Sequence, residues 1–242
     1  MRTPEYLKRL DPSKQTDHPC INCLLETEER ICGGDFDSVS AGDKAWYSTY
    51  KAEMEELERV LREYRPKKII EVGSGSGRII RTVLEVLPSA EIVGTESNMR
   101  IFDYVRKRFA GDKRVTVVKA NIADYLSHSG DYDLAICLMN TFGNINDPDV
   151  FREIVRHANY FVFSLYNQDF DEQRKLMYEA RGHSDFSFNN GQYYFQDDWI
   201  RGLVSRSYTL GEIEGLVLTS DATLIELKPV GLLYFVVAQK KF

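Results

Sequence analysis

Three glycines at alternate positions are the residues of this sequence with the clearest chemical purpose. In the stretch "IIEVGSGSGRII", Gly73, Gly75 and Gly77 follow a short β-branched run and precede a second apolar run. Glycine tolerates positive φ and has no Cβ, so such a turn can bring backbone N–H groups close to a polar ligand. The stretch predicts a strand, a glycine turn and the start of a helix that together hold a nucleoside-type ligand.

The glycine spacing separates this turn from two other nucleotide-binding loops. A dinucleotide fingerprint reads G-x-G-x-x-G, and Arg78 stands where its third glycine belongs. A Walker loop would need Gly-Lys-Ser or Gly-Lys-Thr after the turn, and neither follows. An ordinary tight turn between a strand and a helix is the remaining alternative.

Polar side chains follow three further predicted strands at the points where those strands end. Glu96 ends the second strand, about 20 residues beyond the last glycine, where a carboxylate can accept both ribose hydroxyls. Asn121 follows the third strand, where its amide could read an adenine edge while Ile122 covers the ring. Asn140 and Thr141 follow the fourth strand directly. Ligands of doubly wound sheets bind at this edge, so these residues predict one site.

Strands and helices alternate along most of the chain, which predicts an α/β fold with a doubly wound, Rossmann-like parallel sheet. After the fifth strand the alternation stops. The last two strands are separated only by Pro229-Val230-Gly231, too short for a parallel crossover, so we expect an antiparallel hairpin. The predicted strands are 68–72, 91–96, 115–120, 133–139, 160–166, 222–228 and 232–240.

An insertion, residues 168–209, precedes the last predicted helix. Its stretch "FSFNNGQYYF" predicts a hairpin around an Asn-Asn-Gly turn, and "GLVSRSY" a third short strand. We expect this small antiparallel β insertion to act as a substrate lid, and a dimerisation arm is the alternative. Its aromatic residues are Phe186, Phe188, Tyr193, Tyr194, Phe195 and Trp199.

The N-terminal part differs from the rest in composition. We expect residues 1–44 to form a loosely structured cap and residues 45–242 to form the main domain. A helix should pass through "YKAEMEELERVLREY" and end before Pro66. Within the cap, His18, Cys20, Cys23 and Cys32 could ligate zinc, but the spacing is not that of a strong zinc motif, so we assign no metal site.

The composition narrows the function classes. The 242 residues carry a formal net charge of −6, so no basic field favours nucleic acid, and 43% hydrophobic residues exclude wholesale disorder. No apolar run reaches the ~20 residues of a membrane span, and the N-terminus has no apolar stretch typical of a signal peptide. We expect a cytoplasmic protein that does not enter membranes.

Residues 45–167 and 208–242 resemble a class I S-adenosylmethionine-dependent methyltransferase. The motif "EVGSGSGR", the acidic Glu96, Asn121 and the terminal hairpin match that family in order, although many members have Asp where Asn121 stands. The resemblance implies a seven-stranded sheet with the last strand antiparallel, and S-adenosyl-L-methionine as cofactor. It implies cofactor contacts for Glu71, Gly73, Ser74, Gly75, Gly77, Arg78, Glu96, Ser97, Asn121, Ile122, Met139 and Asn140.

The resemblance is weaker on the methyl acceptor. "MNTFGNI" and the inserted strands are similar to small-molecule methyltransferases, which implies a small N or O nucleophile as substrate. Candidate catalytic residues are Tyr47, Tyr50, Asn140 and Tyr166, although the two tyrosines of "WYSTY" could simply pack under the cap. Three alternatives stay open: a macromolecular substrate reached through a partner, a non-catalytic binding protein and, remotely, a nicotinamide-dependent reductase. A homodimer is also possible.

Overall fold

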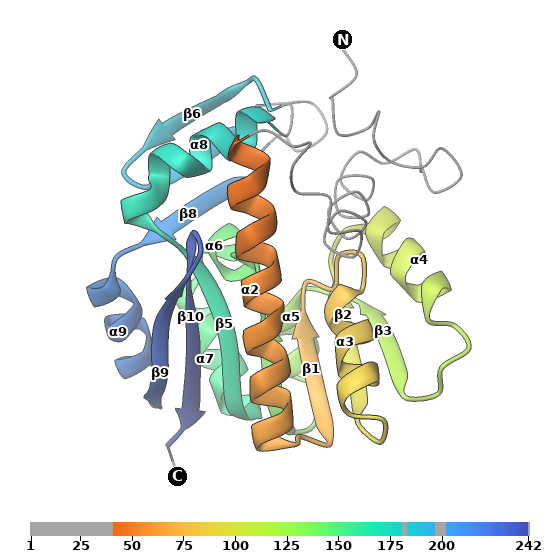
Figure 1. The fold of residues 1–242 in the computed structure, drawn as a ribbon. Helices are drawn as coiled ribbons and strands as arrows, with labels where there is room; N and C mark the ends of the chain where they lie inside the picture. The colour runs from red at the N-terminus through yellow and green to blue at the C-terminus, as the bar shows by residue number, and fades with distance from the viewer. Residues whose placement is uncertain (1–40, 181–182, 197–201, 242) are drawn as a thin grey trace.

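A central β-sheet with helices on both faces makes up most of the molecule (Figure 1). The computed structural model describes residues 41–180, 183–196 and 202–241. The zinc candidates His18, Cys20, Cys23 and Cys32 lie outside these residues, as does Trp199.

The seven predicted strands form the body of the sheet, in the order β3-β2-β1-β4-β5-β10-β9. Six of these strands run in one direction and β10 runs in the opposite direction. The predicted seven-stranded sheet with an antiparallel last strand is therefore confirmed. The strands are β1 (Lys68–Val72), β2 (Glu91–Glu96), β3 (Val115–Lys119), β4 (Tyr132–Cys137), β5 (Ala158–Asn167), β9 (Ala222–Val230) and β10 (Leu233–Lys240).

Two apolar cores, one on each face of the sheet, fix this arrangement. Helices α2 (Ala41–Tyr64), α3 (Arg78–Val86) and α4 (Met99–Arg108) pack on one face through residues such as Leu57 and Ile80. Helices α5 (Ile122–Leu126), α7 (Pro148–His157) and α9 (Leu210–Leu218) pack on the other. Burying these faces supplies the main driving force for the fold. A short helix, α6 (Thr141–Ile145), follows β4.

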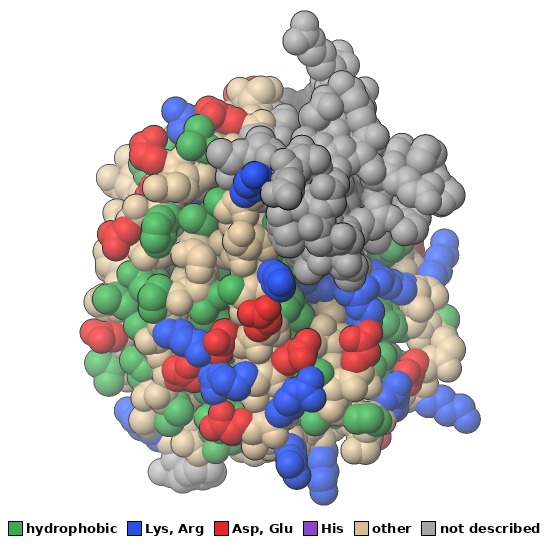
Figure 2. Space-filling model, viewed as in Figure 1, with side chains coloured by type: hydrophobic (Ala, Val, Ile, Leu, Met, Phe, Trp, Pro, Cys, Tyr) green, Lys and Arg blue, Asp and Glu red, His purple; other side chains and the backbone are tan. Residues whose placement is uncertain are grey.

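Helix α2 is longer than the apolar stripe predicted. It begins at Ala41, so "WYSTY" is helical and the boundary placed between residues 44 and 45 falls within the first turn. Its outer face carries interspersed charges of both signs (Figure 2), and Glu56 on this face pairs with Arg59 of the same helix and with Lys228 of β9. The inner face packs on β9 and β10.

The insertion contains the predicted strands and also a helix that the sequence pattern did not reveal. Strand β7 (Gln192–Phe195) pairs antiparallel with both β6 (Phe186–Asn189) and β8 (Val204–Tyr208), and β8 pairs parallel with the end of β5. A 3-10 turn (Gln168–Phe170) leads into α8 (Asp171–Ala180). The buried face of α8 is Arg174, Met177 and Tyr178, and an arginine in the first of these positions hides the apolar periodicity.

Candidate functional site

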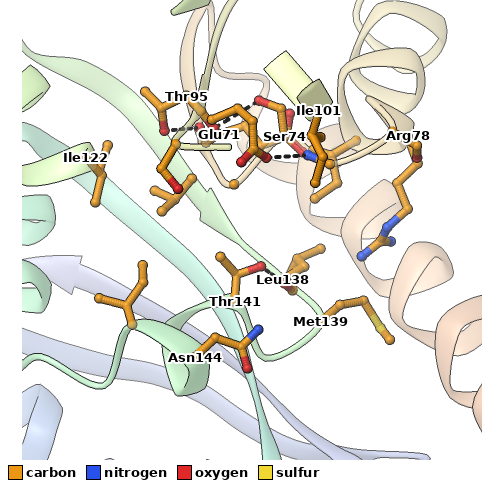
Figure 3. A pocket seen from close by; sticks show the side chains of 18 of the residues that line it. Glu71, Ser74, Arg78, Thr95, Ile101, Ile122, Leu138, Met139, Thr141 and Asn144 are labelled. Atoms are coloured by element: carbon orange, nitrogen blue, oxygen red, sulfur yellow. Dashed lines mark hydrogen bonds between the residues drawn. The ribbon is translucent and has the colours of Figure 1, made fainter. Parts of the chain in front are cut away.

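A cavity of about 480 Å³ opens at the carboxyl ends of β1, β2 and β4, within the usual size range of ligand sites. Figure 3 shows Glu71 and Ser74 on one side of it and Leu138, Met139 and Thr141 on the other. Every predicted cofactor residue lines it except Gly77 and Asn140.

The glycine loop takes the backbone conformation that glycine favours. Gly73 and Gly75 have φ values of +76° and +52°, and a Cβ on Gly73 would lie 2.7 Å from the Thr141 methyl group. Gly77, at φ +83°, has another purpose: a Cβ there would overlap with the Phe109 ring on α4. Gly77 therefore permits close packing of α4, and it does not line the pocket.

Glu71 places an unsatisfied carboxyl oxygen beside this loop. The residue is 1% exposed, and its Oε2 has no hydrogen-bond partner. Burial raises the pKa of Glu71 well above its ordinary value, and the Glu96 charge raises it further, whereas the Arg78 charge and a Ser74 hydrogen bond lower it. A buried polar atom without a partner requires an explanation, and a cationic ligand group in the pocket would supply one.

Glu96 lies in the cavity wall and is held there by two backbone N–H groups. One carboxylate oxygen accepts the Gly75 N–H at 3.2 Å and the other accepts the Asn98 N–H at 2.8 Å. Burial raises the pKa of Glu96, while hydrogen bonds from the backbone of residues 98, 75 and 97 lower it. A carboxylate accepts about four hydrogen bonds, so each oxygen keeps capacity for a ligand hydroxyl.

Asn121 and Ile122 form the far wall of the pocket. The Asn121 Oδ1 accepts the Ala123 N–H at 3.0 Å and so caps helix α5. Only its amide N–H groups then remain to donate to a ligand, because an amide oxygen at a cap is already engaged. Ile122 is 5% exposed and lines the cavity, as predicted for a residue that covers a ring.

Met139 and Asn140 form a turn in the left-handed region, at φ +52° and +58°. Met139 lines the pocket, but the Asn140 side chain is fully buried behind it. Its Oδ1 accepts the Tyr166 N–H at 3.0 Å, and its Nδ2 donates to the Ser205 hydroxyl at 3.1 Å. Asn140 therefore stabilises the turn from behind, and its side chain does not line the cavity.

Of the four catalytic candidates, Tyr50 alone lines the pocket. Tyr47 is 0% exposed and Tyr166 4% exposed, and both belong to the packed interior. The Tyr50 ring instead lies against the Arg78 guanidinium, 4.3 Å from the ring centroid. Helical spacing explains the difference, because Trp46 and Tyr50 are one turn apart and both line the cavity, whereas Tyr47 faces inward.

Three further residues belong to the site or support it although no sequence pattern predicted them: Asn144, Leu203 and Glu53. Asn144 and Leu203 line the pocket. Glu53 is fully buried behind it and hydrogen-bonded to Arg78. A signal for Glu53 was present, since Tyr50, Glu53 and Leu57 lie on one helix face and a glutamate interrupts that apolar stripe.

The aromatic residues of the insertion pack mainly against one another. Tyr193 and Phe195 are almost completely buried against Tyr178 of α8, with ring centroids 5.2 and 4.9 Å apart. Leu203, next to β8, is the described residue of the insertion that lines the pocket. The insertion thus shares a small core with β5 and the β9–β10 hairpin, and it touches the site at its edge.

Among the described residues, no helix is long and apolar enough to cross a membrane. In the same part of the chain, His, Cys, Asp and Glu side chains form no group that could hold a metal ion.

The order of the strands, the glycine loop and the acidic residues that follow it define a class I methyltransferase fold. Residues 69–159 match the family described as "Methyltransferase domain". This match and the sheet topology agree with the resemblance to class I S-adenosylmethionine-dependent methyltransferases. The sequence matches no curated protein.

Solved structures share this fold at low sequence identity. An S-adenosylmethionine-dependent methyltransferase from Clostridium acetobutylicum ATCC 824 has a TM-score of 0.65 at 12% identity, covering 92% of this chain and 100% of its own. The CcbJ methyltransferase from Streptomyces caelestis has a TM-score of 0.57 at 14% identity, covering 79% and 90%. The N-terminal domain of EvdMO1, crystallised with SAH and D-fucose, has a TM-score of 0.53 at 11% identity, covering 78% and 82%. These comparisons support S-adenosyl-L-methionine as the cofactor.

Proposed function

We propose that this chain binds S-adenosyl-L-methionine and transfers its methyl group to a nitrogen or oxygen of a small molecule. The observation that carries the proposal is the pair of buried carboxyl groups, Glu71 and Glu96, beside the glycine loop of one cavity. The cofactor has an ammonium group at one end and a ribose diol further along. Glu71 supplies a partner for the first, and Glu96 supplies acceptors for the second.

The bound cofactor would supply an electrophilic methyl carbon on a sulfonium. A lone pair of the acceptor would form the new bond to this carbon, and the sulfur would leave with the electron pair of the broken carbon–sulfur bond. Transfer in line requires alignment above all, and walls that hold the acceptor provide it. Trp46, Tyr50, Met139 and Leu203 give the open part of the pocket an apolar and aromatic lining.

Tyr50 is our candidate for orienting the acceptor. Its ring is fixed by the contact with Arg78, and its position on α2 places it at the cavity wall. An acceptor that arrives neutral needs no strong base, since it can release its proton to solvent after the methyl group has moved. The proposal therefore does not depend on a titratable base in the pocket.

Binding experiments test the cofactor. Calorimetry with the full chain should show binding of S-adenosylmethionine and S-adenosylhomocysteine and none of NAD. Binding of NAD with no response to either sulfur nucleoside would overturn the proposal and favour a reductase.

Methyl transfer is tested with cofactor labelled on the methyl group. Incubation with a metabolite extract should label a small molecule. Label that appears only in protein or nucleic acid when a cell extract is added would favour the macromolecular alternative. Cofactor binding without label anywhere would favour a non-catalytic binding protein. We further propose a cytoplasmic location and a homodimer, which cell fractionation and sedimentation would test.

A further inference from the structure

Glu53 is a fully buried carboxylate with three partners from three different elements. Its Oε2 accepts from Arg78 Nη2 at 2.9 Å. Its Oε1 accepts the Met139 N–H at 2.8 Å and also the Ser164 hydroxyl. Glu53 is 0% exposed and does not line the cavity. It thus links helix α2 to the glycine loop, to the turn after β4 and to strand β5.

The Met139 contact holds a backbone conformation that is costly for this residue type. Met139 lies at φ +52°, in a region that non-glycine residues seldom occupy. Such a conformation persists only where surrounding contacts determine it. The Glu53 carboxylate accepts the Met139 N–H, and the side chain of the next residue, Asn140, accepts the Tyr166 N–H. Both residues of the turn are thus held by hydrogen bonds. The Met139 side chain is therefore held at the pocket wall.

The Arg78 contact fixes a positive charge at the same wall. Burial alone lowers the pKa of Arg78, but Tyr50, Glu53 and Glu71 raise it above its ordinary value, so the guanidinium stays charged. Figure 3 shows the Arg78 side chain reaching from the start of α3 toward the side where Met139 lies. The side-chain ion pair with Glu53 is 8% exposed at Arg78 and 0% at Glu53, so water screens it little.

These charges act on the ligand as a set. Glu71 and Glu96 line the pocket with Arg78, and Glu53 lies directly behind Arg78. The ion pair with Glu53 neutralises the Arg78 guanidinium locally, so that the Arg78 charge does not oppose a cation in the pocket. Without the Glu53 charge, the guanidinium would repel a cation in the pocket. The sulfur cofactor changes by one positive charge during its reaction, from a sulfonium to an uncharged thioether.

We propose that Glu53 is a positioning residue that holds Arg78 and the Met139 turn in place and makes the pocket favour the sulfonium form of the cofactor over its uncharged product. This inference rests on the proposed function, because it concerns the same ligand. It adds a role for a residue that touches neither the cofactor nor the acceptor.

The test compares the affinities of the full chain for S-adenosylmethionine and S-adenosylhomocysteine by calorimetry. In the Glu53→Gln variant, we expect the affinity for S-adenosylmethionine to fall about tenfold more than that for S-adenosylhomocysteine, because a buried positive charge is no longer neutralised. Glu56→Gln, on the same helix but in a surface ion pair with Lys228, is the matched control and should leave the ratio unchanged. Equal losses for both ligands in Glu53→Gln would overturn the proposal.

Two more variants keep the test decisive if Glu53→Gln fails to fold. The double variant Glu53→Gln/Arg78→Gln removes both charges and should return the ratio of affinities to within about threefold of the original. Arg78→Gln alone should shift the ratio toward S-adenosylmethionine, and an unchanged ratio there also overturns the proposal. If the unaltered chain binds neither ligand, the proposed function itself is wrong, which is a different result from binding with an unaffected ratio.

Discussion

The Asn140 amide and the Ser205 hydroxyl, 3.1 Å apart, join the turn after β4 to the inserted strand β8. Ser205 is 2% exposed and also contacts the Tyr178 hydroxyl at 2.7 Å. The insertion is therefore connected to the pocket wall through a side chain that never reaches the pocket. This connection gives the insertion a route by which it can affect turnover.

The first prediction concerns that connection. Ser205→Ala should lower stability by about 1–2 kcal/mol, because it leaves the buried Asn140 amide without its acceptor. Turnover should fall while cofactor affinity stays within about twofold, since the glycine loop is untouched. Ser207→Ala is the matched control, because Ser207 lies on the same strand but donates to the Gly191 carbonyl. Equal turnover in both variants would show that the connection is only structural.

The second prediction concerns pH and Glu71. Its folded pKa is raised, so the folded state holds a proton more tightly than the unfolded state between the ordinary value of 4.5 and the raised value. The free energy of unfolding should therefore fall as pH rises through this interval. Glu71→Gln should abolish this decrease in the free energy of unfolding. It should therefore stabilise the ligand-free protein at pH 7 by about 1–3 kcal/mol, as measured by denaturant unfolding.

The same substitution should weaken cofactor binding, because an amide cannot pair with an ammonium group. In the unaltered protein, affinity should fall as pH drops through the raised Glu71 pKa, since the protonated carboxyl loses its charge. Calorimetry in buffers of different ionisation enthalpy would report the proton released on binding. If Glu71→Gln raises the free energy of unfolding and binds the cofactor as tightly as the unaltered protein, Glu71 does not contact the cofactor.

The third prediction tests Glu96 as the ribose anchor. Glu96→Ala should cost about 1.5–3 kcal/mol of cofactor affinity, because two ligand hydroxyls lose a charged acceptor. Glu91→Ala, at the exposed start of the same strand, should have no effect. Unchanged affinity in a folded Glu96→Ala variant, shown by its circular dichroism spectrum, would mean that Glu96 only caps the Gly75 and Asn98 amides.

The fourth prediction separates a substrate lid from a dimerisation arm. Leu203 lines the pocket at 37% exposure, so Leu203→Ala should raise the KM for the acceptor severalfold with little change in cofactor affinity. Phe188→Ala, on β6 and 48% exposed, should leave KM unchanged. If Phe188→Ala instead alters the sedimentation coefficient with activity intact, the insertion is an interface between subunits.

The sequence revealed the sheet and the cofactor half of the site because both depend on local signals. Strand periodicity, the glycine turn and an acidic residue at the end of a strand are each visible in a stretch of a few residues. The other half depends on contacts between distant segments. Glu53 meets Met139 and Ser164 only after α2 packs across the sheet, and Asn140 meets Ser205 across the insertion. No spacing along the chain encodes such pairs.

Predictions from residue type alone also failed where a polar or charged side chain is buried in the structure. Tyr47 and Tyr166 were expected to present aromatic, polar side chains at the site, yet both are buried and neither lines the cavity. Arg174 is 1% exposed between the rings of Tyr166 and Tyr193, at 5.1 and 4.7 Å from the centroids, and so broke the pattern of α8. Long arginine side chains pack on aromatic faces, which a hydropathy pattern reads as polar surface.

The position of β10 has a consequence for how the molecule assembles. β10 follows β9 in the chain, yet it lies between β5 and β9 in the sheet. Until β10 has paired with β5, β9 has no place to join, and α9, which packs on β9, has none either. We therefore expect the hairpin to enter the sheet as a unit, through contacts made across a long sequence separation, which slow folding. A chain halted before β10 would leave the hydrogen-bonding edge of β5 exposed to other chains.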